Sequence, residues 1–101
     1  MTATNAPEAS RLAEMLVSAR LAACVQILPE MESVYHWQGA IEREREVLLL
    51  AKTTRASFDD LERQVRALHS YKVPEIIALP VVTGSEPYLD WMREESMSDK
   101  L

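Results

Sequence analysis

The sequence contains one cysteine, two glycines and no apolar run long enough to cross a bilayer. Because Cys24 has no second cysteine to pair with, an intrachain disulfide is excluded and a reducing compartment is favoured. The apolar stretch VLLLA at 47–51 falls well short of the roughly 20 residues that a membrane helix requires. Residues 1–10 lack the basic start and apolar segment of a signal peptide. We therefore expect a cytoplasmic protein with no membrane partner.

Basic residues are also in the minority, with 11 lysines and arginines against 16 acidic residues and a net charge of −5. A chain of this charge is not attracted to nucleic acid or to an anionic membrane. Internal repeats and linkers are missing, and 101 residues suit one hydrophobic core. The sequence predicts a single domain over residues 1–101, with nucleic acid excluded as the main partner.

Three amphipathic helices are predicted. The first begins after Asn5, an N-cap residue, with Pro7 in its first turn and Glu8 at the third position. The second covers 55–69, and its apolar stripe comprises Phe58, Leu61, Val65 and Leu68. A short third helix covers 86–95, after which residues 96–101 are expected to form a frayed tail.

Two alternating segments, 23–39 and 41–53, predict a long β-hairpin that turns at Gln38-Gly39-Ala40. Pro29 cannot donate a ladder hydrogen bond, so a kink or bulge is expected there. Simple alternation places Val25 and Ile27 on the same face as Tyr35 and Trp37. The segment EIIALPVV at 75–82 predicts a further short strand, which Pro80 marks as an edge strand.

The outer half of this hairpin is charged on both faces, with glutamates at 42, 44 and 46 and arginines at 43 and 45. Such a ribbon does not lie in its own core. It is either a solvated arm held by cross-strand Glu–Arg pairs or a ribbon that docks on a neighbouring subunit. We favour docking, because Tyr35 and Trp37 would otherwise be large exposed aromatic residues.

Three long segments resemble the CutA family of divalent-cation tolerance proteins: RLAACVQILP (20–29), SVYHWQGAIERERE (33–46) and LHSYKVPEIIALPV (68–81), followed by YLDW (88–91). The resemblance covers about residues 9–94. It implies an α+β fold, a ferredoxin-like βαββαβ sandwich with an extended hairpin and a short C-terminal helix. It also implies a PII-like homotrimer whose hairpins exchange strands. The trimer interface predicted on this basis comprises Tyr35, Trp37, Glu42, Arg43, Glu44, Arg45 and Trp91.

The sequence departs from that family in two places. Residues 1–5 are only a remnant of the apolar first strand, which should lie centrally in the strand order 4-1-3-2. Its loss would leave buried backbone groups unpaired at about 1–3 kcal/mol each, so we expect an upstream start or a compensating strand. Ser70 stands where the family usually has proline, and the backbone there is expected to be looser.

A polar cluster precedes the predicted strand at 75–82. Pro74 holds the preceding residue extended, which fixes Tyr71 and Glu75 after His69 at the end of the second helix. One interpretation is structural: His69 caps the helix, Tyr71 packs under the sheet, and Glu75 pairs with Lys52 or with backbone amides. The other is a ligand pocket between subunits, formed by Trp37, Lys52, His69, Tyr71 and Glu75.

Metal and catalytic motifs are scarce. Some CutA proteins carry a cysteine in the first strand and a doubled histidine, both associated with copper. Here that strand is missing and Leu68 stands at the second histidine position, so tight copper binding is not implied. No cofactor is predicted to be required, and His69 alone would hold Cu²⁺ or Zn²⁺ weakly, with micromolar affinity at best. No nucleophile elbow or phosphate-binding loop indicates an enzyme.

The predicted function is therefore that of a homotrimeric binding or assembly module in divalent-cation tolerance and the response to metal ions. Two alternatives remain. One is a PII-like sensor of a nucleotide or other small ligand. The other is an enzyme of unknown substrate at the cleft between subunits.

Overall fold

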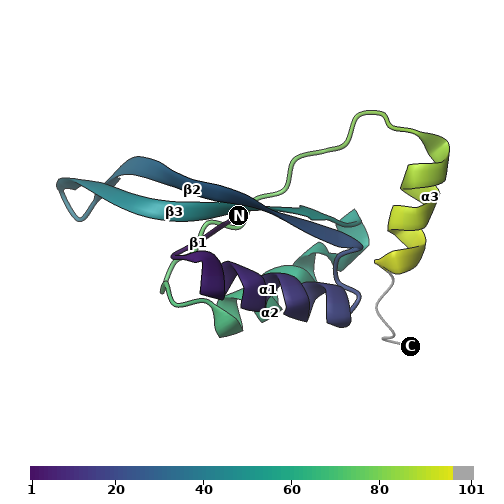
Figure 1. Ribbon diagram of the computed structural model, residues 1–101, viewed down its shortest axis with the longest axis horizontal. Coiled ribbons are helices and arrows are strands. Elements are labelled where there is room, and N and C mark those ends of the chain that lie inside the picture. Colours follow the sequence, from purple (N-terminus) through teal and green to yellow (C-terminus); the bar gives the residue numbers. More distant parts are fainter. Residues whose placement is uncertain (97–101) are drawn as a thin grey trace.

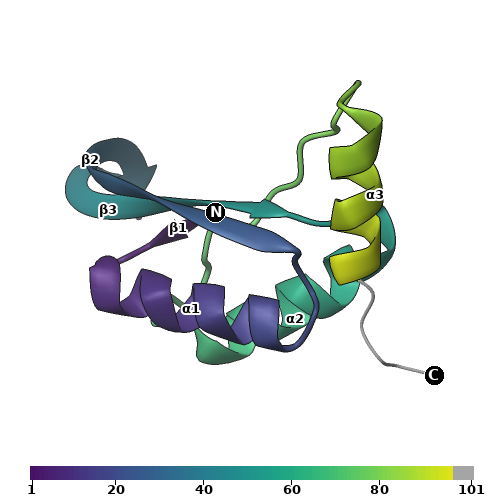
Figure 2. The same cartoon turned by 45° about the vertical axis from the view of Figure 1, so that its right-hand side comes forward.

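The computed structural model describes residues 1–96. The chain forms β1 (Thr2–Ala3), α1 (Ala6–Ser18), β2 (Cys24–Trp37), β3 (Ala40–Lys52), a 3-10 turn (Arg55–Ser57), α2 (Phe58–Leu68) and α3 (Glu86–Glu95). The three strands form one antiparallel sheet in the order β1-β3-β2. Helices α1 and α2 cover one face of this sheet, and α3 stands at its end (Figures 1 and 2). This is the mixed α+β, ferredoxin-like arrangement that the sequence predicts.

The two packed helices begin and bury their faces largely as expected. The Asn5 side chain accepts a hydrogen bond of 2.9 Å from the backbone N–H of Glu8, which caps α1. Leu12 and Leu16 of α1 and Val65 of α2 are fully buried beneath the sheet. The prediction that Leu68 continues the α2 stripe is wrong, because its side chain is 46% exposed. The backbone becomes extended at the next residue, His69, and the histidine ring is buried in its place.

The long hairpin and its bulge are confirmed. Trp37 pairs with Ala40, and Gln38 and Gly39 both have positive φ, as a two-residue type I′ turn requires. The register shifts between Leu28 and Met31, which places the bulge around Pro29.

The bulge also reverses the alternation along β2. Leu28 pairs with Leu48 and Met31 with Glu46, so three steps along β2 correspond to two steps along β3. Leu48 and Glu46 share a face of β3, so Leu28 and Met31 share that face too. The prediction that Tyr35 and Trp37 share a face with Val25 and Ile27 is therefore wrong. They lie on the face of Leu28, which is the face that no described helix covers.

Packing differs accordingly between the two faces of β3. Val47 and Leu49 point toward α1 and α2 and are buried, whereas Leu50, on the uncovered face, is 42% exposed. The sheet therefore uses one face for the core of the chain and presents the other to its surroundings.

The predicted strand at 75–82 is not formed, since residues 74–85 contain no helix or strand. In the expected order this strand would pair with the free edge of β1. Strand β1 has only two residues, paired to Leu48 and Val47 of β3, so it offers too little backbone for a ladder. The segment instead passes from α2 around the β1 edge towards α3 (Figure 1).

Ser96, the first residue of the predicted tail, is buried, and its carbonyl accepts a hydrogen bond of 2.9 Å from the Ser57 hydroxyl. The remainder of that predicted tail, 97–101, lies outside the described residues. Within the described part of the chain, no helix combines the length and apolar character needed to cross a membrane.

Leu49→Ala should lower the free energy of unfolding by about 2–5 kcal/mol, because it leaves a cavity at a fully buried position. Leu68→Ala is the matched control and should change it by no more than about 0.5 kcal/mol. Urea denaturation followed by circular dichroism would measure both. Equal losses would contradict the assignment of Leu68 to the surface.

Candidate functional site

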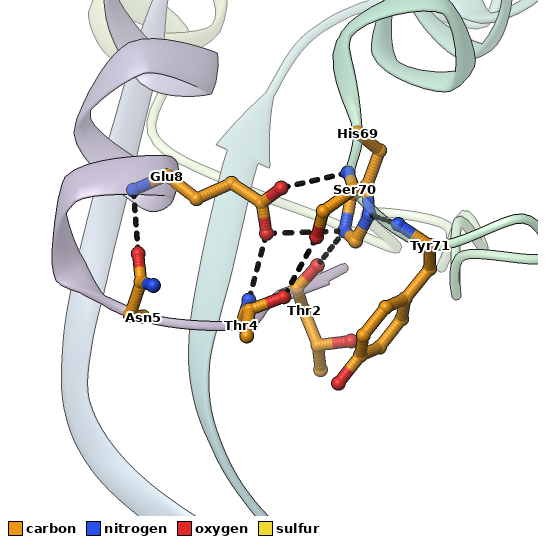
Figure 3. Close-up of polar contacts among 7 residues, drawn as sticks. All are labelled: Thr2, Thr4, Asn5, Glu8, His69, Ser70 and Tyr71. Carbon is orange, nitrogen blue, oxygen red and sulfur yellow. Dashed lines mark hydrogen bonds and ion pairs between the residues drawn. The ribbon is translucent and has the colours of Figure 1, made fainter.

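His69 is buried at the point where α2 meets β1 (Figure 3). Its Nδ1 atom accepts a hydrogen bond of 2.9 Å from the backbone N–H of Tyr71. Its Nε2 atom lies 2.8 Å from the carbonyl oxygen of Thr2. Since Nδ1 acts as the acceptor, Nε2 carries the proton and donates it to Thr2. Both ring nitrogens of the neutral imidazole are thus engaged, and a metal ion would have to displace one of these bonds.

Glu8 is a second buried polar residue in this region, and its carboxylate joins two distant segments. One oxygen accepts a hydrogen bond of 2.8 Å from the backbone N–H of Thr4, and the other accepts one of 2.8 Å from that of Ser70. The Thr4 and Ser70 hydroxyls also lie 2.8 Å apart. The expectation of a looser backbone at Ser70 is therefore wrong, because its N–H and hydroxyl are both held.

These contacts set the acidity of Glu8. Burial by itself would raise the pKa, but the hydrogen bonds from Thr4 and Ser70 favour the ionised form more strongly and lower the pKa from 4.5 to about 2. The sequence indicated part of this role, because a glutamate three residues after Asn5 is typical of a capping box. The contact with Ser70 follows only from the tertiary fold.

A cleft with a volume of about 730 Å³ lies between the outer half of the hairpin and the segment after α2. Of the five predicted pocket residues, the structure brings Trp37, Tyr71 and Glu75 together in its lining. His69 does not line the cleft, but its ring supports that of Tyr71 at a centroid distance of 5.1 Å. Tyr35 and Glu46 also line the cleft, and no sequence pattern pointed to either of them as a pocket residue.

Lys52, the remaining predicted pocket residue, does not line the cleft. It pairs with Cys24 at the opposite end of the hairpin from the turn, and its ammonium donates to the side-chain oxygen of Gln26. The structural interpretation that pairs Glu75 with Lys52 is therefore not realised among the described residues.

Burial and nearby negative charge raise the pKa of two tyrosines at the cleft. Burial and then the negative charge of Glu46 raise the pKa of Tyr71. Desolvation and then the carboxylates of Glu44, Glu46 and Glu42 raise the pKa of Tyr35. Loss of a proton from either phenol is disfavoured, so neither tyrosine is prepared to act as a base at neutral pH.

The predicted interface residues lie mostly on the hairpin. Arg43 pairs with Glu32 at 3.0 Å and Arg45 with Glu30 at 2.9 Å, all four side chains being exposed. Glu42 and Glu44 lie opposite Tyr35 and Ser33 on the other face. Trp91 is separate from them, on α3, where the centroid of its ring lies 5.6 Å from that of the Tyr88 ring.

A preformed metal site is not visible in the part of the chain that the structure describes, since no three His, Cys, Asp or Glu side chains there gather closely enough to hold an ion. Metal binding at His69 remains a prediction, and so does the trimer interface.

Glu8→Gln should lower the free energy of unfolding by about 1–3 kcal/mol at pH 7, because the new amide group must face a backbone N–H that needs an acceptor. The folded-state pKa lies below the ordinary value, so this stabilisation is complete above pH 4.5 and is lost as the pH falls towards 2.

Thermal or urea unfolding between pH 2 and 7 would test this, with exposed Glu14→Gln on the same helix as control. The difference between wild type and Glu8→Gln should vanish at the acid end of the range. A difference that does not change with pH would contradict the role of the ionised carboxylate.

Comparison with known proteins places this architecture in a family. Residues 1–95 match the family described as CutA1 divalent ion tolerance protein. The divalent-cation tolerance protein CutA of Thermus thermophilus is 48% identical over 96 residues, which cover 95% of this chain and 93% of that protein. The human protein CutA is 44% identical over 103 residues, a match that spans all of this chain and 58% of the human protein.

Solved structures agree. The Thermus thermophilus divalent cation tolerance protein superposes with a TM-score of 0.93 at 48% identity, covering 95% of this chain and 93% of that one. The periplasmic divalent cation tolerance protein CutA from Archaeoglobus fulgidus superposes with a TM-score of 0.92 at 38% identity, over 95% and 93% of the two chains. Because sequence and fold agree over nearly the whole length, this chain belongs to the CutA1 family of divalent ion tolerance proteins.

Proposed function

We propose that the chain acts as a homotrimeric binding or assembly module in divalent-cation tolerance, without catalytic turnover. The observation that supports the trimer is the sheet face that no described helix covers. Leu28, Leu50 and Trp37 are all partly exposed on this face. Large apolar side chains left exposed on one face are typical of an interaction site.

Unpaired backbone supports the same proposal. Among residues 1–96, strand β2 pairs only with β3, so its other edge is open there, and the segment 75–82 has no strand partner. Ile77, Leu79 and Val82 of that segment are also exposed. An open edge and an extended apolar segment can each pair with a strand of a sister chain, which is how the hairpins would exchange strands between subunits.

Light scattering in dilute buffer should give a mass three times the 11.5 kDa of the chain. Leu50→Lys should reduce that mass, because it places a charge in the centre of the apolar face. Val17→Lys on α1, where the side chain is exposed to a similar degree, should leave the mass unchanged. A monomeric wild-type protein would refute the proposal.

The family name and the relatives' names describe tolerance of divalent cations and specify no reaction. A weak affinity for Cu²⁺ or Zn²⁺ is the most that His69 supports, since both of its ring nitrogens are hydrogen-bonded. We therefore propose that any metal is bound at the surface or between subunits and is not a required cofactor.

Calorimetric titration with Cu²⁺ or Zn²⁺ should give a dissociation constant no tighter than about 1 µM. His69→Ala and His36→Ala test the two histidines separately, the second being the exposed one. A sub-nanomolar site that survives His69→Ala would contradict weak binding through His69.

The PII-like alternative gains little support from the cleft. A nucleotide phosphate would meet Glu46 and Glu75 there, with Lys72 as the basic side chain of the described lining. For location we propose the cytoplasm on the basis of the single cysteine, although one relative is named periplasmic and another chloroplastic. The proposed partner is the chain itself, with no nucleic acid.

A further inference from the structure

Arg20 occupies the turn that ends α1, in a backbone conformation that is unusual for its residue type. Its φ of 58° lies in the left-handed region, where residues other than glycine are strained. The turn itself is well defined, because the backbone N–H groups of Leu21 and Ala22 both donate to the carbonyl of Leu16, at 2.9 and 3.2 Å. Glycine would make the same turn without strain, so the turn by itself does not account for an arginine at this position.

The arginine side chain reaches the C-terminal end of α3. Its Nη2 atom donates a hydrogen bond of 2.8 Å to the carbonyl of Glu94, and its Nη1 atom lies 3.5 Å from the carboxylate of Glu95. The Glu94 carbonyl belongs to the last turn of α3, where carbonyl groups have no partner within the helix. A positive charge there also complements the negative end of the helix dipole. Arg20 therefore caps a helix end that lies 74 residues further along the chain.

Of these two contacts, the hydrogen bond to the Glu94 carbonyl is the stronger. The ion pair with Glu95 is open to solvent, with 41% and 44% of the two side chains exposed, and such pairs add little stability. A hydrogen bond from a charged donor is stronger than one from a neutral donor. The Ser57 hydroxyl supports the same end of α3, because it donates a hydrogen bond of 2.9 Å to the carbonyl of the buried Ser96.

Helix α3 is attached to the rest of the chain mainly at this end. Met92 is the buried residue of α3. At the other end, the segment 74–85 that leads into the helix contains no helix or strand, and the Ser85 side chain does not cap the helix. Figure 2 shows α3 at the end of the sheet, with its C-terminal end nearest to α1 and α2. The position of α3 therefore depends on the turn after α1 and on the turn before α2.

The aromatic residues of α3 remain exposed in this position. Tyr88 is 45% exposed and Trp91 is 42% exposed, and their rings contact each other. The segment before α3 is apolar and exposed as well, with Val82 at 91%. This is the segment 75–82 whose pairing with a sister chain is proposed above, and it runs directly into α3. A sister chain that pairs with it is thereby brought to the aromatic surface of the helix.

We propose that Arg20 is a positioning residue for subunit contact: by capping α3 from the end of α1, it holds the Tyr88–Trp91 pair where a sister chain docks. The partner is a second copy of this chain. The inference rests on the proposed homotrimer and adds to it a residue that lies outside both the sheet face and the hairpin. If the sister chain alone held α3 in place, the Arg20 side chain could be removed without effect on assembly.

Arg20→Gly is the variant that tests this role, since glycine keeps the left-handed turn and removes the side chain. Unlabelled and isotope-labelled samples of the full chain are mixed, and the exchange of subunits is followed by native mass spectrometry. We expect Arg20→Gly to exchange subunits about fivefold faster than wild type or more, which corresponds to the net contribution of one hydrogen bond. Amide hydrogen exchange should become faster in residues 86–95 and stay unchanged in α1 and β3.

Arg93→Gln is the matched control. It removes a positive charge from α3 itself, where Arg93 pairs with Asp90 of the same helix at 3.0 Å, and it should change subunit exchange by no more than about twofold. Glu95→Gln removes only the exposed ion pair and should have an equally small effect. Subunit exchange of Arg20→Gly at the wild-type rate would overturn the inference. Faster hydrogen exchange throughout the chain would also overturn it, because Arg20 would then stabilise the whole fold without positioning α3.

Light scattering on the wild type separates this inference from the proposed function. A trimer in which Arg20→Gly has no effect refutes the role of Arg20 and leaves the homotrimer intact. A monomeric wild-type protein refutes the homotrimer and, with it, the role of Arg20 in subunit contact. Hydrogen exchange in residues 86–95 of that monomer would still report whether Arg20 caps α3.

Discussion

The structure depends on how two residues of β1 are held against β3. A two-residue strand has a short ladder, here with partners at Leu48 and Val47. Met1 adds two hydrogen bonds to Leu49: its carbonyl accepts one of 2.7 Å from the Leu49 N–H, and its terminal ammonium donates one of 3.0 Å to the Leu49 carbonyl. The remaining attachment is polar and tertiary. His69 donates to the Thr2 carbonyl, and Glu8 accepts from Thr4 and Ser70. A buried, fully satisfied network of this kind adds to the attachment that the two-residue ladder provides.

The same network positions the cleft. Thr2 and Ser70 both line it, and Tyr71 follows directly after the residue whose backbone Glu8 holds. His69 accepts from the backbone of Tyr71 and contacts its ring. The orientation of Tyr71 is therefore set by groups that lie outside the cleft.

The bulge at Pro29 is the second constraint, because it decides what each face of the hairpin carries. Without the extra residue, Tyr35 and Trp37 would project toward the helices together with Val25. With it, they join Glu46 on the uncovered face. The arginines are thereby separated from the aromatic residues and form exposed ion pairs, each of which adds little stability on its own. One inserted residue thus places Tyr35 and Trp37 beside the glutamates of β3 and away from its arginines.

The sequence by itself determined the elements that local chemistry specifies. Asn5 and Glu8 define the start of α1, the helical spacing defines α1 and α2, and Gln38-Gly39 with alternating residues defines the hairpin. Family motifs added the overall fold. Tertiary structure alone decided three features: the face of Tyr35, the burial of His69 in place of Leu68, and the absence of a strand at 75–82. The face of Tyr35 depends on the register with β3, the burial of His69 on the carbonyl of Thr2, and the absence of the strand on the length of β1. Each of these partners lies far away in the chain, and local sequence patterns do not encode such distant pairings.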